Sequence, residues 1–124
     1  MPVAVVDASA LGAAGFGEPE GPAVGARLAG ATLAAPAILW FEMTNICLTK
    51  IRRDPEEADS LVHMFRRTRE LPVGIHEVDY PAVLALAQGT GLSAYDASYL
   101  WLARHLGAEL VTLDQPLAAA WSRG

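Results

Sequence analysis

Short apolar runs alternate with longer amphipathic segments along the chain. Residues 3–6 (VAVV) form a continuous, largely β-branched run, which is typical of a strand buried on both faces. Apolar positions at helical spacing, bounded by Pro, Gly and Asp, predict most of the other elements. We expect strands at residues 3–6, 32–35, 73–78 and 110–113, and helices at residues 8–14, 23–29, 38–53, 55–69, 80–88, 93–106 and 116–121.

Two helix boundaries are predicted from individual residues. Asp54 and Pro55 would supply an N-cap and a first-turn proline for the helix at 55–69. Gly89 would end the helix at 80–88.

The alternation of strands and helices predicts an α/β sandwich around a parallel sheet. Hydrophobic residues make up 52% of the 124 residues and charged residues 19%, which excludes extended disorder. We find no internal repeat and no linker, so residues 1–124 are expected to form one domain.

The start of the chain and its single cysteine bear on the cellular compartment. The N-terminus lacks the basic region of a secretory signal, and the apolar runs are too short to span a bilayer. We therefore expect a cytoplasmic protein without a membrane segment. Cys47 lies in an apolar run and is expected to be a buried core thiol.

Four of the fourteen acidic residues lie within apolar sequence or at its edge: Asp7, Glu42, Asp96 and Asp114. None of them has a Lys or Arg within four positions. Asp7 and Asp114 end predicted strands and would emerge at the carboxyl edge of a parallel sheet, where open α/β sheets bind ligands. Glu42 and Asp96 lie near the starts of helices that can cover this edge. The pattern predicts one shared site.

Each acid also has a local explanation. Asp7 and Asp114 could cap the helices that follow them, and Ser93 and Asp96 fit a capping box. Glu42 could lie on a solvated helix face, although its helical neighbours are not basic. Four independent coincidences are less economical than one site.

A shared site of four carboxylates points to a metal ion. Carboxylates brought together without cations raise one another's pKa values, and a divalent cation removes that cost. Oxygen ligands favour Mg²⁺ or Mn²⁺. His63, His76 and His105 share no ligand spacing and are expected to be surface or packing residues.

The ordered motifs VVDAS, FEMTN, LSAYDASYLWLA and LVTLDQPL resemble a PIN domain, and most closely a VapC-type toxin of a toxin–antitoxin pair. The resemblance covers essentially the whole chain. It implies a three-layer α/β/α sandwich with a small parallel sheet. It also implies that Asp7, Glu42, Asp96 and Asp114 bind Mg²⁺ or Mn²⁺ and catalyse RNA cleavage. Ser9, Asn45 and Thr112 match positions that orient water, phosphate or the acids.

The function implied by the resemblance is a metal-dependent endoribonuclease that works as a homodimer, cleaves tRNA or rRNA, and is silenced by a cognate antitoxin protein. Alternatives are a housekeeping PIN-type nuclease and a non-catalytic PIN-like module that binds RNA or protein. A phosphatase- or receiver-like domain using Asp7 is a further alternative, although no second acid follows two residues later.

Two further features have competing interpretations. Six of the nine basic residues fall between positions 50 and 69, within a chain of net charge −5. They could follow RNA phosphates, border a groove for the antitoxin, or simply form solvated helix faces, and we favour the last. Five aromatic residues are expected to pack in the core or at a dimer interface rather than to stack on bases: Trp40, Phe41, Tyr95, Tyr99 and Trp101.

Overall fold

Four parallel strands form a single sheet in the computed structural model, which describes residues 2–124. The strands are β1 (Val3–Val6), β2 (Thr32–Pro36), β3 (Val73–His76) and β4 (Glu109–Val111), in the order β3-β2-β1-β4. Strand β1 pairs with β2 on one side and β4 on the other, so it is a central strand of the sheet. Val5 and Val6 are fully buried, which confirms the prediction for this run.

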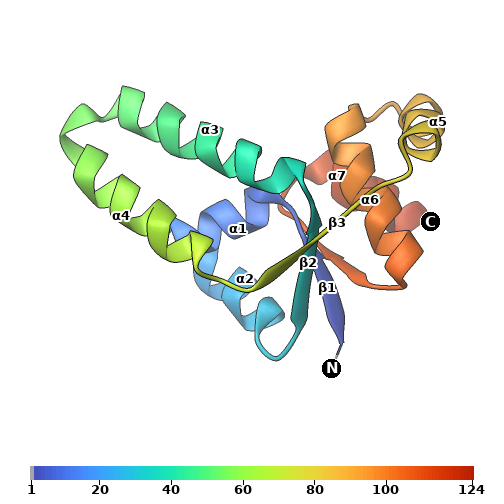
Figure 1. Cartoon of the computed structure of the whole chain (residues 1–124), viewed down its shortest axis with the longest axis horizontal. Helices are drawn as coiled ribbons and strands as arrows, with labels where there is room; N and C mark the ends of the chain where they lie inside the picture. Colours follow the sequence, from blue (N-terminus) through green and yellow to red (C-terminus); the bar gives the residue numbers. More distant parts are fainter. Residues whose placement is uncertain (1) are drawn as a thin grey trace.

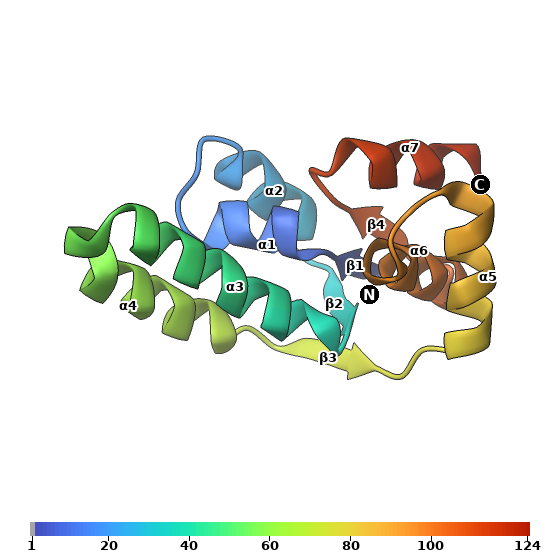
Figure 2. The ribbon, with the colours of Figure 1, turned by 90° about the horizontal axis from the view of Figure 1, so that it is seen from above.

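Helices cover both faces of the sheet (Figures 1 and 2). On one face lie the first four helices, and on the other the last three. The helices are α1 (Ala8–Gly15), α2 (Gly21–Leu28), α3 (Ile38–Arg53), α4 (Ala58–Arg69), α5 (Tyr80–Thr90), α6 (Ala94–Leu106) and α7 (Gln115–Arg123), with a 3-10 turn η1 (Pro55–Glu57) between α3 and α4. The predicted three-layer α/β/α sandwich is confirmed.

Helix α6 is the apolar centre of the second helical layer. It contacts β1, β2 and β4 as well as α5 and α7. Leu100 and Leu102 are fully buried, and on the opposite face of the sheet Leu39 and Met43 of α3 fill the same role. Burial of these apolar side chains between the helices and the sheet stabilises the three-layer arrangement.

Several predicted boundaries were wrong, including the end of β3, which was predicted at residue 78 and lies at His76. Three of the differences have a clear local cause. Helix α5 runs past Gly89 and ends at Gly91, whose φ of 78° is the left-handed conformation that glycine adopts most easily. Asp54 makes no side-chain cap, and the segment after it begins as the 3-10 turn η1. Strand β4 ends at Val111, because its partner β1 has already ended; the last bond between them joins the Asp7 amide to the Val111 carbonyl.

The strand order excludes the receiver-like alternative. Receiver-type folds have the order 2-1-3-4-5, in which the first strand lies between the second and third. Here β1 lies between β2 and β4, and β3 is an edge strand.

Helices α3 and α4 form an antiparallel pair that extends beyond the sheet (Figures 1 and 2). The basic residues that cluster in the sequence fall into the last turns of these two helices. Because the helices are antiparallel, Lys50, Arg52 and Arg53 lie at the far end of the pair, whereas Arg66, Arg67 and Arg69 lie near the sheet. The sequence cluster is therefore two separate groups in space, each placed where a helix C-terminus favours positive charge.

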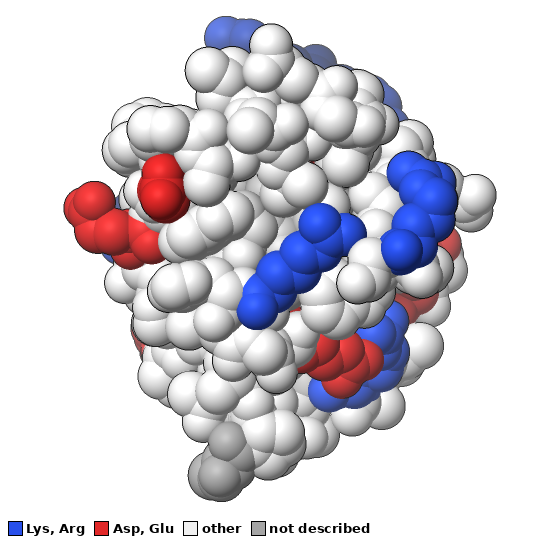
Figure 3. Space-filling view, turned by 90° about the vertical axis from the view of Figure 1, so that its right-hand side faces the viewer, with Lys and Arg blue, Asp and Glu red and all other residues white. Residues whose placement is uncertain are grey.

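Within residues 2–124, no helix is both long enough and apolar enough to cross a membrane. Viewed from the side of α5 to α7, most of the surface is uncharged and the charged side chains are scattered (Figure 3).

Candidate active site

The four acids predicted to share a site line one pocket. Asp7 follows β1, Glu42 lies in the second turn of α3, Asp96 in the first turn of α6, and Asp114 immediately before α7. The pocket has a volume of about 520 Å³ and contains no Lys or Arg in its wall. The prediction that the chain brings these carboxylates together at the carboxyl edge of the sheet agrees with this arrangement.

Asp7 is the most deeply buried of the four, with 4% of its surface exposed. Its Oδ1 accepts hydrogen bonds from the Ser9 hydroxyl at 2.7 Å and the Ala10 amide at 3.0 Å, and its Oδ2 accepts one from Thr112 Oγ1 at 2.5 Å. Burial raises the pKa of Asp7, and the nearby Asp114 adds to the rise, while the three hydrogen bonds oppose it.

Ser9 and Thr112 connect the two acids that follow strands. Thr112 Oγ1 donates to Asp7 and accepts from the Asp114 amide at 3.0 Å. Ser9 Oγ accepts from the Leu113 amide at 2.9 Å, so it joins the start of α1 to the segment that leads into Asp114. These contacts hold the β4–α7 connection against the end of β1.

Glu42 is held by Tyr99, a residue that was predicted only to pack in the core or at a dimer interface. Tyr99 Oη donates a hydrogen bond to Glu42 Oε1 at 2.6 Å, from α6 to α3. Burial raises the pKa of Glu42, the Tyr99 bond lowers it, and Asp96 and Asp7 raise it. Two features of the sequence could have indicated that Tyr99 contacts an acid of the pocket. Tyr99 lies one helical turn after Asp96, on the same face of the helix, and a buried tyrosine hydroxyl usually has a hydrogen-bond partner.

Asp96 faces the pocket from a partly exposed position. Burial raises its pKa, as do the charges of Asp114 and Asp7, while a hydrogen bond with Ser93 opposes the shift. The shared effects among Asp7, Glu42, Asp96 and Asp114 show that these groups influence one another electrostatically.

The capping roles and the shared pocket are not alternatives. Asp7 and Asp114 each accept a bond from an amide three residues later, and the Asp96 amide donates to Ser93 Oγ at 3.1 Å. A carboxylate has two oxygens, so Asp114 can cap α7 through Oδ1 and still present Oδ2 to the pocket. Local capping positions these acids at the sheet edge.

The donor set fits a hard divalent cation. Four carboxylates share a pocket without basic residues, and their mutual repulsion is the cost that such a cation offsets. Among residues 2–124, no three acidic, His or Cys side chains converge closely enough to enclose a metal ion by themselves. Mg²⁺ commonly binds to one or two carboxylates and keeps several waters, and carboxylates spread around a pocket wall suit that mode.

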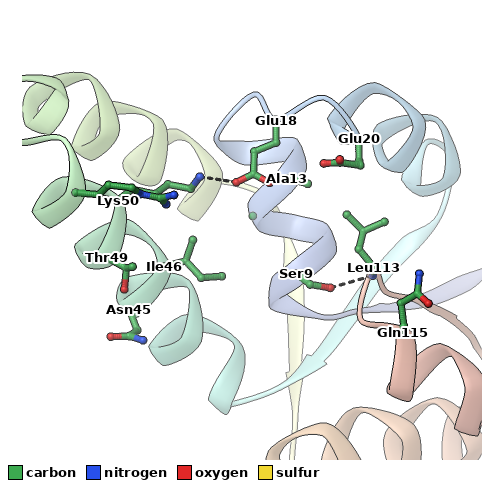
Figure 4. A pocket seen from close by; sticks show the side chains of 12 residues that line it. Ser9, Ala13, Glu18, Glu20, Asn45, Ile46, Thr49, Lys50, Leu113 and Gln115 are labelled. Carbon is green, nitrogen blue, oxygen red and sulfur yellow. Dashed lines mark hydrogen bonds and ion pairs between the residues drawn. The ribbon is translucent and has the colours of Figure 1, made fainter.

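Asn45 lies one turn after Glu42 on α3 and lines the same pocket. It also lines a second pocket of about 640 Å³, shown in Figure 4, and the two pockets share Ser9, Asn45 and Ile46, so they are neighbours.

The aromatic residues divide into three environments. Tyr99 is buried, as expected for core packing, whereas Phe41 and Tyr95 are 78% and 60% exposed at the pocket rim. For these two residues only the dimer-interface half of the expectation remains a prediction. Trp101 stacks on His105 with ring centroids 4.6 Å apart, and the Arg69 guanidinium lies 4.6 Å from the centroid of the Trp40 ring.

The other predicted single-residue environments are confirmed. Cys47 is buried at 5% exposure, and its thiol approaches the Leu61 carbonyl oxygen at 3.7 Å. His63, His76 and His105 are exposed.

Comparison with known proteins agrees with this architecture. The crystal structure of PAE2754 from Pyrobaculum aerophilum superposes with a TM-score of 0.76 at 26% sequence identity, covering 96% of this chain and 86% of that one. No curated protein sequence matches the chain significantly. The model of the PIN domain family matches residues 4–120, which is nearly the whole chain. The chain therefore belongs to the PIN domain family and has a nuclease-type fold.

Proposed function

We propose that this protein is a metal-dependent endoribonuclease and the toxin of a VapC-type toxin–antitoxin pair. The observation that carries the proposal is the single pocket lined by Asp7, Glu42, Asp96 and Asp114 in a chain of the PIN domain family. Only these side chains bring charge to the wall of that pocket.

In this proposal the four carboxylates hold Mg²⁺ or Mn²⁺. Such an ion, when bound, lowers the pKa of a water molecule and offsets the negative charge of the attacked phosphate. The protein's own contribution is to hold the carboxylates ready at low reorganisation cost. Ser9 and Thr112 keep Asp7 in place, and Tyr99 keeps Glu42 in place.

The same pocket supports the proposed regulation by an antitoxin. Four carboxylates without a basic neighbour form a strongly attractive site for a guanidinium group, which can bind carboxylates through two parallel hydrogen bonds. An Arg side chain from an antitoxin segment would pair with carboxylates of the pocket and occupy the space that metal and RNA need.

The experiment is cleavage of a mixed tRNA and rRNA pool by antitoxin-free protein, with Mg²⁺, with Mn²⁺ and with chelator, beside Asp96→Asn. Discrete fragments that require metal and disappear in the variant are the expected result. Unchanged cleavage by Asp96→Asn would overturn the assignment of the acids. Metal binding without cleavage would instead support the non-catalytic alternative.

The toxin role needs a separate test, because a housekeeping PIN-type nuclease would cleave RNA as well. Induced expression of the wild-type protein should arrest growth, and co-expression of a cognate antitoxin, sought as a small reading frame directly upstream, should relieve the arrest. Asp96→Asn should be harmless. Growth unaffected by an active nuclease would favour the housekeeping alternative.

A further inference from the structure

The pocket next to the acid pocket contains a salt bridge that closes its far end (Figure 4). Lys50 Nζ, from the last turn of α3, pairs with Glu18 Oε1, from the connection between α1 and α2. The Lys50 side chain is 20% exposed and that of Glu18 is 37% exposed. The Lys50 ammonium also lies 5.7 Å from the centroid of the Phe16 ring. The lysine is therefore fixed in the pocket wall instead of extending into solvent.

The α3 side chains that line the two pockets follow helical spacing. Glu42, Asn45 and Thr49 are separated by three and four residues, and Arg53 continues the row after four more. At 1.5 Å per residue, Arg53 lies about 16 Å further along the helix than Glu42. One face of α3 thus changes from acid to amide, hydroxyl and guanidinium with increasing distance from the acid pocket.

Two acidic and two basic side chains line this second pocket. Glu18 and Glu20 face Lys50 and Arg53 across the pocket, and Arg53 forms no ion pair with any residue from 2 to 124. With Lys50 occupied by Glu18, Arg53 is the cation that remains available to a ligand. A phosphate could recruit Lys50 by replacing the Glu18 carboxylate, because both are oxygen anions that accept from an ammonium.

We propose that this pocket binds an RNA nucleotide near the one cleaved, that Arg53 and Lys50 take its phosphate, and that Glu18 competes with RNA for Lys50. The inference rests on the proposed function, since it takes the acid pocket to be the cleavage site. The distance along α3 places the two cations too far from the acid pocket for the scissile phosphate and within reach of another phosphate of the same strand. Because Glu18 already pairs with Lys50, RNA must displace it to use that lysine. RNA that binds only in this pocket is therefore held weakly, whereas RNA that also binds in the acid pocket gains further contacts.

The test is RNA binding by two variants that break the same salt bridge from opposite sides and by a third that removes the Arg53 charge. Lys50→Gln, Arg53→Gln and Glu18→Gln are made in an Asp96→Asn background, so that RNA is not cleaved. A fluorescein-labelled single-stranded RNA of randomised sequence is titrated in Mg²⁺ at several KCl concentrations, with anisotropy as the readout. Arg27→Gln is the matched control, because Arg27 pairs with Glu109 at 2.5 Å on α2 and β4, outside both pockets.

Lys50→Gln and Arg53→Gln should each weaken binding about tenfold and reduce the salt dependence by about one phosphate contact. Glu18→Gln should tighten binding several-fold, and Arg27→Gln should change little. A merely structural salt bridge predicts a different pattern: Lys50→Gln and Glu18→Gln would lower the melting temperature together and would not move RNA affinity in opposite directions.

The outcomes separate this inference from the proposed function. If the wild-type protein cleaves RNA but the three variants bind like the Arg27→Gln control, the adjacent subsite is wrong and the nuclease stands. If the wild-type protein does not cleave yet the opposite shifts appear, the subsite stands in an RNA-binding module. If the wild-type protein does not cleave RNA and no RNA binds, both proposals fall.

Discussion

Tyr99 donates a hydrogen bond of 2.6 Å to Glu42 and so links the two helices that bring acids to the pocket from opposite faces of the sheet. The phenol is 1% exposed, and burial together with the Glu42 carboxylate raises its pKa far above the ordinary value. Tyr99 therefore stays protonated at neutral pH and donates to Glu42. It positions Glu42 and, in the proposed function, does not itself exchange a proton.

Tyr99→Phe should reduce RNA cleavage at least tenfold while the fold is retained. The ring still fills its place in the core, but Glu42 loses the donor that orients it, and its pKa rises further. Removing one such bond should lower the free energy of unfolding by about 1–3 kcal/mol. Cleavage rates and urea unfolding measure the two effects, and Tyr99→Leu, which also loses the ring, controls for packing. Full activity in Tyr99→Phe would contradict the positioning role.

Thr112→Val should lower cleavage by more than Thr112→Ser. Valine has the size of threonine but offers neither the donor to Asp7 nor the acceptor for the Asp114 amide, whereas serine retains both. We expect a loss of at least tenfold in Thr112→Val and near wild-type rates in Thr112→Ser. Equal rates in both variants would show that the hydroxyl is dispensable.

Metal and pH should act together on stability. The pKa values of Asp7, Glu42 and Asp96 are raised above 3.8, 4.5 and 3.8, chiefly by burial. Between these ordinary values and the raised ones, the folded state holds more protons than the unfolded state, so these groups lower stability as pH increases. Their destabilising effect is complete above the raised pKa values and vanishes below the ordinary ones.

In chelator at neutral pH, Asp96→Asn should therefore melt roughly 2–5 °C above the wild-type protein, and the advantage should shrink as the pH approaches 3.8. Adding Mg²⁺ should raise the melting temperature of the wild type more than that of the variant, because only a state that binds the ion is stabilised by it. Scanning calorimetry at several pH values measures both. A metal-independent melting temperature in the wild type would count against the shared site.

The expected homodimer has a candidate surface on α5 and the pocket rim. Tyr80 is 72% exposed and Leu84 is 61% exposed, one turn apart on α5, beside exposed Phe41 and Tyr95. Exposed apolar patches of this kind commonly mark protein interfaces. Light scattering should give about twice the chain mass of 13.1 kDa, and Leu84→Glu should shift it towards the monomer.

Leu71→Glu is the matched control for this surface, since Leu71 is also partly exposed, at 43%, but lies between α4 and β3. It should leave the mass unchanged. A monomeric wild-type protein at micromolar concentration would refute the homodimer.

Sequence alone was sufficient wherever a structure depends on near neighbours. The buried strand at VAVV, the Asp7, Ser93 and Asp114 caps and most helix spans follow from spacing along the chain, and each is present. The choice of four acids also came from local context, because the absence of nearby Lys and Arg is a property of the sequence.

What only the tertiary structure decided are the contacts between distant segments. Tyr99 contacts Glu42, which is 57 residues away in the sequence, and Thr112 contacts Asp7, which is 105 residues away. No pattern of spacing along the chain predicts either contact. One cluster of basic residues in the sequence became two groups, because an antiparallel turn places the ends of α3 and α4 apart. Phe41 and Tyr95 lie in apolar stretches of the sequence, and only the tertiary structure shows that both are exposed at the pocket rim. Spacing along the chain determines which face of a helix a residue occupies. Whether that face contacts the sheet, another helix or solvent depends on how the layers of the sandwich pack.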